Sequence, residues 1–223
     1  ERLTTTAEDF LHRTLTTWAD ERRRLDNFLV GKSFHPVTTK LLYNNVDLTY
    51  CNLLFDFTYN RDYLATTNPD NEIVKRPIPS SYYNFLQNID LQDPTLMASS
   101  EFSTLINRLE FSPLYARVEF QGEDTYKKID STFLVRSGYD ELPFLYNVAK
   151  LRDLKSAYPY ARTDSALHRL RDKFDQAVEH PYLQAENQRL HQQTIQKRVG
   201  YEVPDSYGGQ VFKNIIAAHK GKV

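Results

Sequence analysis

The most reactive side chain in the sequence is the single cysteine, Cys51, whose thiolate could act as a nucleophile or a metal ligand. Leu48 and Phe55 lie three positions before it and four after it, so a helix here places all three on one apolar face. A cysteine buried on such a face behaves as a small hydrophobic residue and is a poor nucleophile. We therefore predict that Cys51 is part of the core, and one cysteine cannot close a disulfide within the chain.

Histidine is the other common metal ligand and general base, and the chain has six: His12, His35, His168, His180, His191 and His219. They form neither an H-E-x-x-H motif nor a pair one helical turn apart with a carboxylate nearby. The sequence therefore predicts no metal site and no cofactor. An enzyme site would have to be assembled from side chains on distant helices.

Charged clusters offer two further kinds of chemistry. The acidic pairs Glu8-Asp9, Glu123-Asp124 and Asp140-Glu141 could work as acid and base, but each lies at a predicted helix start, where negative charge complements the helix dipole. Arg22-Arg23-Arg24 could bind an anion, yet adjacent helical residues point in different directions and acidic residues flank the triplet. We predict a solvated, internally paired surface there and assign no catalytic residue.

The 15 tyrosines allow two interpretations. A groove lined by tyrosine could bind a peptide or a glycan, whereas a tyrosine near a helix end can fill the core while its hydroxyl reaches water or a carbonyl. Their scatter along the chain favours packing, and recognition stays open as the alternative. The tyrosines concerned are Tyr82, Tyr83, Tyr115, Tyr126, Tyr139, Tyr146, Tyr158, Tyr160 and Tyr182.

Composition limits the folds and partners that can hold these residues. The chain has 7 glycines in 223 residues, against about sixteen at the usual share of roughly 7%. This shortage counts against barrels, sandwiches and phosphate-binding loops and favours helices. A net charge of −1 argues against nucleic acid as a partner. The longest apolar run, 215–218, is too short to span a membrane.

The spacing of apolar residues predicts an all-α fold of about eight to ten helices, with antiparallel pairs as the local unit. A first helix begins at Thr5-Thr6 and ends at Gly31, and Pro36 opens a second that runs over 37–63. A surface connection without helix is predicted for 65–79. Further helices are predicted over 80–89 and 100–109, each capped by a serine, over 113–120 and 124–135, from Pro143, from a cap at Asp164, and from Pro181 to Val199.

The last part of the chain departs from this pattern, because Gly200, Gly208, Gly209 and Gly221 fall within it. We predict a helical domain over 1–199, an extended linker over 200–209, and a short helix with the first residue of a strand over 210–223. A strand without a partner implies a fold that continues past Val223. A first residue other than methionine, Glu1, implies that an N-terminal segment has been removed.

Residues Val211-Phe212-Lys213-Asn214-Ile215-Ile216 and His219-Lys220-Gly221-Lys222-Val223 resemble the lead-in to the thioredoxin-like domain of TlpA-type thiol-disulfide oxidoreductases, in the AhpC/TSA superfamily. In that family a Trp-Cys-x-x-Cys motif follows. Four upstream stretches are similar to the helical region that precedes this domain in envelope proteins of Gram-negative bacteria. They are 79–86, which reads Pro-Ser-Ser-Tyr-Tyr-Asn-Phe-Leu, together with 99–102, Asn107-Arg108 and 180–183.

The redox dithiol itself is missing from this sequence, because thiol-disulfide exchange needs two cysteines. The resemblance therefore implies a helical accessory domain, without enzymatic activity of its own, of a periplasmic or envelope-anchored disulfide reductase. Its implied partners are the thioredoxin-like domain of the same chain and client proteins, and it could also self-associate. The alternative is a stand-alone helical module that recognises peptide or glycan through its tyrosines.

Overall fold

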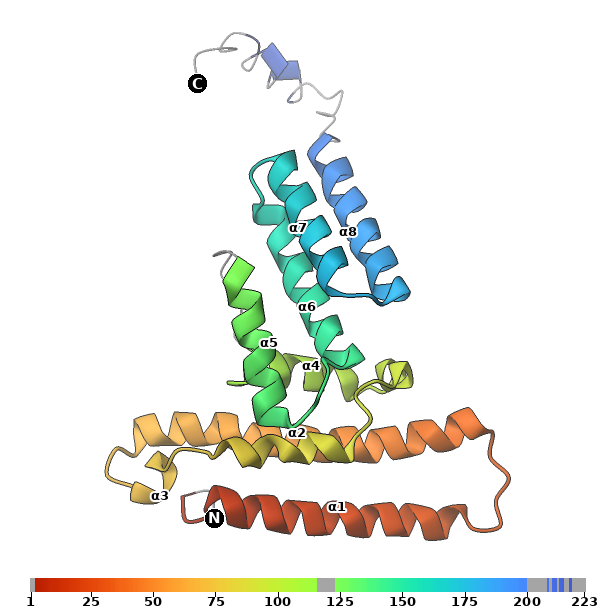
Figure 1. Ribbon diagram of the computed structural model, residues 1–223, viewed down its shortest axis with the longest axis vertical. Coiled ribbons are helices and arrows are strands. Elements are labelled where there is room, and N and C mark those ends of the chain that lie inside the picture. The colour runs from red at the N-terminus through yellow and green to blue at the C-terminus, as the bar shows by residue number, and fades with distance from the viewer. Residues whose placement is uncertain are drawn as a thin grey trace. The chain divides into compact units, whose positions relative to one another are not determined.

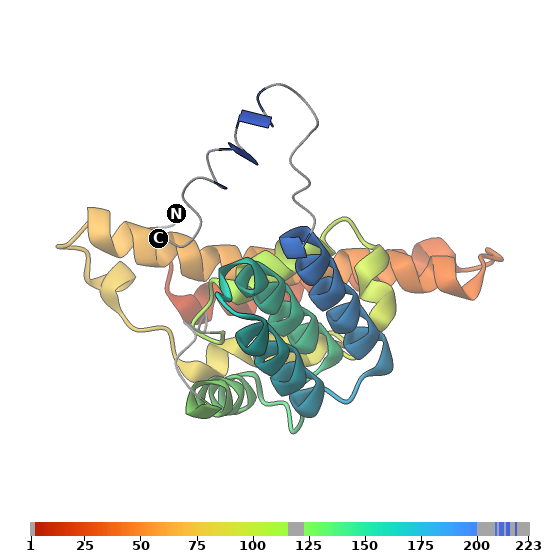
Figure 2. The ribbon, with the colours of Figure 1, turned by 90° about the horizontal axis from the view of Figure 1, so that it is seen from above.

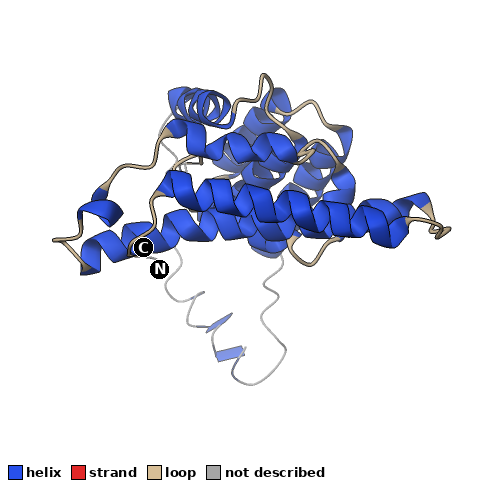
Figure 3. Ribbon diagram, turned by 90° about the horizontal axis from the view of Figure 1, so that it is seen from below, coloured by secondary structure: helices blue, strands red, loops and turns tan. Residues whose placement is uncertain are grey.

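The computed structural model describes residues 3–115 and 123–199, together with positions 208, 210, 211, 213, 214 and 217. Within these residues every regular element is a helix (Figure 3). The chain divides into two compact units, Glu1–Asp153 and Leu154–Val223, with the boundary inside one helix, α6. The all-α fold predicted from the sequence is confirmed.

The first two helices, α1 (Ala7–Leu29) and α2 (Pro36–Thr67), run antiparallel beside each other (Figure 1). The hydroxyl of Thr6 caps α1 by accepting a hydrogen bond from the backbone N–H of Asp9 at 3.1 Å. Gly31 follows α1 with φ 72°, a left-handed conformation that glycine adopts without strain, so the chain can reverse direction. Pro36 lies in the first turn of α2, where its missing N–H costs nothing. These features are as predicted.

The first unit packs around α2. This helix contacts α1, the short α3 (Glu72–Lys75), the 3-10 helices η1 (Ser80–Asn88) and η2 (Pro94–Ala98), and α4 (Phe102–Glu110). Its buried face includes Leu48, Leu54 and Phe55, none more than 2% exposed. Burial of each such side chain contributes roughly 1.5–3 kcal/mol, so tertiary packing explains why this long helix is stable.

Aromatic residues of η1 form the centre of this core. Tyr82, Tyr83 and Phe85 are at most 2% exposed, and Phe85 meets the ring of Phe55 edge-on at a centroid distance of 5.3 Å. The Tyr82 hydroxyl donates to the carbonyl of Leu54 at 3.0 Å, which satisfies a polar group that burial would otherwise penalise. η1 therefore attaches to α2 by ring packing and by hydrogen bonding.

Helix α5 (Glu123–Ser137) and the greater part of α6 (Phe144–Ala157) complete the first unit. α5 packs on η1. The start of α6 is held where the N–H of Leu145 donates to the carbonyl of Leu91 at 3.0 Å. Lys150 of α6 is 2% exposed and pairs with Asp130 of α5 at 3.1 Å. This ion pair joins α5 to α6.

The second unit contains η3 (Tyr158–Tyr160), α7 (Asp164–Ala177) and α8 (Pro181–Val199). α7 and α8 lie side by side in two perpendicular views (Figures 1 and 2). Asn187 of α8 is fully buried, accepts from the hydroxyl of Tyr158, and donates to Asp175 of α7 at 2.8 Å. This polar network joins all three elements of the unit.

The prediction that 65–79 lacks helix is wrong. α2 continues to Thr67, and α3 forms within the segment because the Asn71 side chain accepts the N–H groups of Ile73 and Val74 at 3.0 and 3.2 Å. Val74 is also 3% exposed, so the short helix is anchored in the core. Asparagine is a common N-cap residue, so Asn71 indicated this helix in the sequence, whereas the spacing of apolar residues did not.

Several predicted caps are also wrong. η1 is a 3-10 helix without a side-chain cap, and α4 likewise has none. Asp93 caps η2 by accepting the N–H of Thr95 at 2.9 Å. Thr163, rather than Asp164, caps α7 through a 3.1 Å bond from Ala166. Local hydrogen bonding determines where these helices begin, because the side chains of serine, threonine, aspartate and asparagine can all accept the N-cap hydrogen bond.

Other predictions concern residues that the structure does not describe. Most of the predicted helix 113–120 lies outside the described residues, as do most of the linker 200–209 and most of the segment 210–223. Among the helices that are described, none combines the length and the apolar character needed to cross a bilayer.

Candidate functional site

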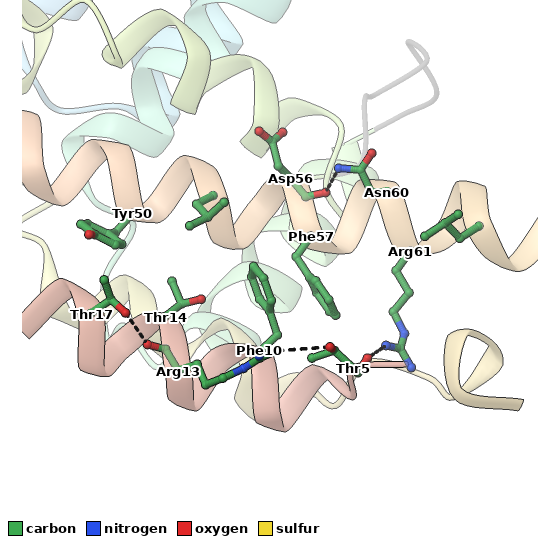
Figure 4. A pocket seen from close by; sticks show the side chains of 12 residues that line it. Thr5, Phe10, Arg13, Thr14, Thr17, Tyr50, Asp56, Phe57, Asn60 and Arg61 are labelled. Atoms are coloured by element: carbon green, nitrogen blue, oxygen red, sulfur yellow. Dashed lines mark hydrogen bonds between the residues drawn. The ribbon is translucent and has the colours of Figure 1, made fainter. Parts of the chain in front are cut away.

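A groove of about 500 Å³ runs between α1 and α2 in the first unit (Figure 4). This volume is typical of ligand sites in proteins. From the segment that leads into α1 and from α1 itself, the groove is lined by Thr5, Phe10, Arg13, Thr14 and Thr17. From α2 it is lined by Tyr50, Leu53, Asp56, Phe57, Asn60, Arg61 and Leu64.

The groove exists because α1 buries little of its apolar stripe. Only Ala7, Thr14 and Trp18 of this helix are buried, and Phe10 and Leu15 are half-buried. Phe10 stacks on Phe57 of α2 with ring centroids 4.1 Å apart, which brings the helices together at one point. The small side chains of Thr14 and Thr17 leave space beside that contact, and the groove occupies it.

One end of the groove contains a buried cation, Arg61, which is 3% exposed. Its guanidinium donates to the backbone carbonyl of Thr5 at 3.1 Å and to that of Ile73, and the carbon Cζ lies 5.7 Å from the centre of the Phe57 ring. Its Nε has no hydrogen-bond partner among the described residues. Burial lowers the pKa of Arg61, and the negative charge of Glu8 opposes that shift. Among the described residues, the hydrogen bonds of the Arg61 guanidinium go to backbone oxygens.

A second guanidinium reaches the same end. Arg13 of α1 is exposed and donates to the hydroxyl oxygen of Thr5 at 3.1 Å, so the two arginines meet at the two oxygen atoms of one residue (Figure 4). Asp56 also lines the groove, but its carboxylate points away from it and pairs with Arg108 of α4. The groove therefore combines apolar side chains with two arginines near one end.

The opposite end of the groove is held in place by a buried carboxylate. Asp47 of α2 is 3% exposed, accepts the indole N–H of Trp18, and binds Arg22 through both carboxylate oxygens at 2.7 and 2.6 Å. Trp18 stacks on Tyr50, which lines the groove, at a centroid distance of 6.0 Å. These contacts fix α1 against α2 beside the groove.

The structure confirms the placement of Cys51. The residue is 0% exposed among Leu48, Leu54 and Phe55, and burial raises its pKa well above the ordinary value, with a further contribution from Asp47. A thiol in this environment is neutral and shielded from reagents. Cys51 is therefore unsuited to nucleophilic attack on a disulfide.

The charged clusters separate into confirmed and corrected predictions. Arg23 pairs with Asp20 and Arg24 with Glu21, as expected for an internally paired surface, whereas Arg22 reaches across to α2. Glu8-Asp9 lies in the first turn of α1 and Glu123 opens α5. Asp140-Glu141 precedes α6 without entering its first turn, so the predicted role at a helix start is wrong there.

The histidines do not assemble a metal centre in the described part of the chain, where no group of three or more histidine, cysteine, aspartate or glutamate side chains could hold an ion. In the second unit His191 is 3% exposed and its ring lies 4.8 Å from that of the exposed His168. Burial lowers the pKa of His191, and the positive charges of Arg171 and His168 lower it further.

Most of the tyrosines singled out in the sequence pack inside the fold. Buried ones are Tyr82, Tyr83, Tyr115, Tyr146 and Tyr158, and Tyr139 is half-buried, with burial raising its pKa to about 12. Tyr160 and Tyr182 are exposed, and the side chain of Tyr126 lies outside the described residues. Packing is thus the main role of this group, and the tyrosine that lines the groove, Tyr50, was not among them.

Comparison of the chain with protein-family models, with curated proteins and with solved structures produced no significant match.

The groove and the burial of Arg61 were not predicted from the sequence. An arginine in the middle of an amphipathic helix ordinarily indicates a solvent-facing position. Its burial depends on carbonyls of Thr5 and Ile73, which are distant in sequence.

Proposed function

We propose that this chain is a non-catalytic helical accessory domain of a TlpA-like thiol-disulfide oxidoreductase, and that the groove between α1 and α2 binds segments of client proteins. The proposal places the parent protein in the periplasm or on the cell envelope, with a thioredoxin-like domain on the same chain. The observation that carries the binding role is the groove itself, with its apolar side chains and with Arg13 and Arg61 near one end.

Two observations support the accessory role. The order of the motifs along the sequence resembles the helical region that precedes a thioredoxin-like domain. The one thiol of the chain, Cys51, is fully buried and its pKa is raised. Since a dithiol cycle needs an attacking and a resolving cysteine, this chain would supply binding and orientation, and the neighbouring domain the chemistry.

The decisive test of the redox assignment is the coding sequence that follows Val223 in the gene. The proposal requires a Cys-x-x-Cys motif there, in the strand-turn-helix setting of a thioredoxin-like active site. A downstream sequence without such a motif would refute the assignment. A complementary measurement is insulin reduction with dithiothreitol, in which the present chain should not exceed the background rate.

The alternative function, a stand-alone module that recognises peptide or glycan, is favoured by one surface feature. Tyr59 and Tyr63 lie one turn apart on α2 and are 60% and 65% exposed. Exposed aromatic rings are common anchors in recognition surfaces. Replacing both with serine should abolish peptide or glycan binding under this alternative and leave binding in the groove unchanged under the main proposal.

A further inference from the structure

The turn that joins α1 to α2, with the helix ends beside it, exposes large apolar side chains. We refer to residues 28–37 as the hairpin tip. Every residue from 30 to 38 is exposed, and four large apolar side chains of the tip are between 39% and 77% exposed. These four are Phe28, Val30, Phe34 and Val37. The rings of Phe28 and Phe34 stack with centroids 6.1 Å apart, so the apolar surface continues across the turn. Apolar patches left exposed on a protein usually mark a binding surface.

The hairpin tip projects from the first unit. In two perpendicular views the turn between α1 and α2 extends past the other elements of that unit (Figures 1 and 2). The groove described above is lined by residues from 5–17 and 50–64, so the hairpin tip shares no residue with it. A projecting apolar turn can enter a soft surface without a collision between that surface and the rest of the unit.

The charge of this region is positive. The stretch from 27 to 46 contains no aspartate or glutamate. Lys32 donates to the backbone carbonyl of Phe28 at 2.6 Å, and its Nζ lies 3.2 Å from the centre of the Phe28 ring. No carboxylate among the described residues pairs with Lys32, whereas Lys40, the other lysine of the stretch, pairs with Asp93 at 3.0 Å. A cation without a carboxylate partner therefore lies directly beside the exposed rings.

Exposed apolar side chains beside a lysine are suited to the interface of a membrane. The apolar groups can enter the boundary between headgroups and acyl chains to a depth of about 5–10 Å, while the lysine ammonium extends back toward the lipid phosphates. Water is still present at this depth, so the polar backbone groups of the non-helical turn keep hydrogen-bond partners. In a dry protein interface each of these groups would need a partner from the other protein.

A second copy of the chain fits the hairpin tip less well. A two-fold symmetric contact through the tip would bring Lys32 of each copy close to the other, and the tip contains no carboxylate to neutralise them. A stable interface also uses about 20–30 residues a side, whereas the hairpin tip has ten. Charge and size both favour a lipid surface.

We infer that the hairpin tip inserts into the interface of an anionic membrane, with Phe28, Val30 and Phe34 among the upper acyl chains and Lys32 against the lipid phosphates. The binding is peripheral, and no described helix crosses the bilayer. This inference is independent of the groove and of the redox assignment, so its failure would leave both of those proposals to their own tests.

Cosedimentation of the intact chain with vesicles measures the binding. Vesicles of phosphatidylcholine mixed with phosphatidylglycerol should bind the chain about fivefold more tightly than vesicles of phosphatidylcholine alone. Lys32→Gln should remove this preference. Val30→Asp should weaken binding at least about tenfold, because a carboxylate is excluded from the acyl chains. Val135→Asp is the matched control, since Val135 is 79% exposed near the end of α5, as Val30 is 77% exposed at the end of α1.

A tryptophan placed in the hairpin tip reports insertion. Emission of a Val30→Trp variant should shift to shorter wavelength when vesicles are added, and lipids brominated on their acyl chains should quench it. Trp18 is 3% exposed, so its own emission should stay constant. Val135→Trp should show neither the shift nor the quenching.

Other outcomes contradict defined parts of the inference. Failure to bind either kind of vesicle, or equal loss in Val30→Asp and Val135→Asp, would overturn it. Equal binding to both kinds of vesicle would overturn the role of Lys32. A dimer seen by sedimentation velocity without lipid, and lost in Val30→Asp, would make the hairpin tip an interface between copies of the chain instead. Circular dichroism of each variant checks that the fold is retained.

Discussion

The indole nitrogen of Trp18 in α1 donates a 2.8 Å hydrogen bond to Oδ1 of Asp47 in α2, and both side chains are 3% exposed. Arg22 binds the same carboxylate through both of its oxygens. This triad connects the two helices that form the groove through three hydrogen bonds to one carboxylate. It fixes the register of the two helices, because α1 buries few apolar side chains of its own.

Substitution of Asp47 tests how much this connection stabilises the fold. Asp47→Asn should lower the free energy of unfolding by about 1–3 kcal/mol, because it removes the charge that binds Arg22 and leaves buried polar atoms poorly matched. Asp20→Asn is the control, since the exposed pair with Arg23 should contribute about 0–1 kcal/mol. Urea denaturation measures both, and equal losses in the two variants would contradict the account.

The burial of Cys51 predicts chemical inertness. A maleimide should modify Cys51 slowly in the native protein and rapidly in urea, because the thiol is 0% exposed and burial raises its pKa. A Val30→Cys variant adds a thiol at a position that is 77% exposed and should react at that site alone under native conditions. Rapid native modification of Cys51 itself would show that the register of α2 is wrong.

The two described glycines with positive φ should differ in their tolerance of alanine. Gly31 and Gly138 both have φ 72°, so either substitution introduces backbone strain of about 1 kcal/mol. A Cβ at Gly31 meets nothing within 4 Å, whereas one at Gly138 would overlap the Gln87 amide, which donates to the Gly138 carbonyl at 3.2 Å. Thermal denaturation should therefore show a larger loss for Gly138→Ala, and a larger loss for Gly31→Ala would contradict this.

The second unit should lose stability in mild acid. Burial, followed by Arg171 and His168, lowers the pKa of His191 in the folded state. Its contribution is therefore complete above the unfolded pKa of about 6.5 and is lost as the pH falls through the folded pKa. The protection factors of the α7 and α8 amides against hydrogen exchange, which correct for the slower intrinsic exchange in acid, should therefore fall between pH 7.5 and pH 5. His191→Phe should remove most of that dependence, and His168→Gln, which removes only one of the charges that lower the pKa of His191, should reduce it less; equal dependence in all three proteins would contradict this.

The sequence predicted some of these features and not others, for physical reasons. Caps and stops are local, so Thr6, Gly31 and Pro36 correctly located α1 and the start of α2, whereas α2 ends four residues later than predicted. The spacing of apolar residues could not predict that η1 is a 3-10 helix, because its aromatic side chains are positioned by tertiary packing on α2. The groove exists because α1 covers α2 incompletely, and the burial of Arg61 depends on carbonyls of residues that are distant in sequence. Neither feature produces a local sequence pattern from which it could be predicted.

The central claim, that the groove receives client segments for a neighbouring redox domain, is tested most directly in the full-length protein encoded by the gene. Leu53 lines the groove and is 44% exposed, so Leu53→Trp should fill the groove without disturbing the core. The account predicts slower reduction of a disulfide-bonded client protein and an unchanged rate with a small aromatic disulfide. Equal rates for the client in variant and wild type would contradict it.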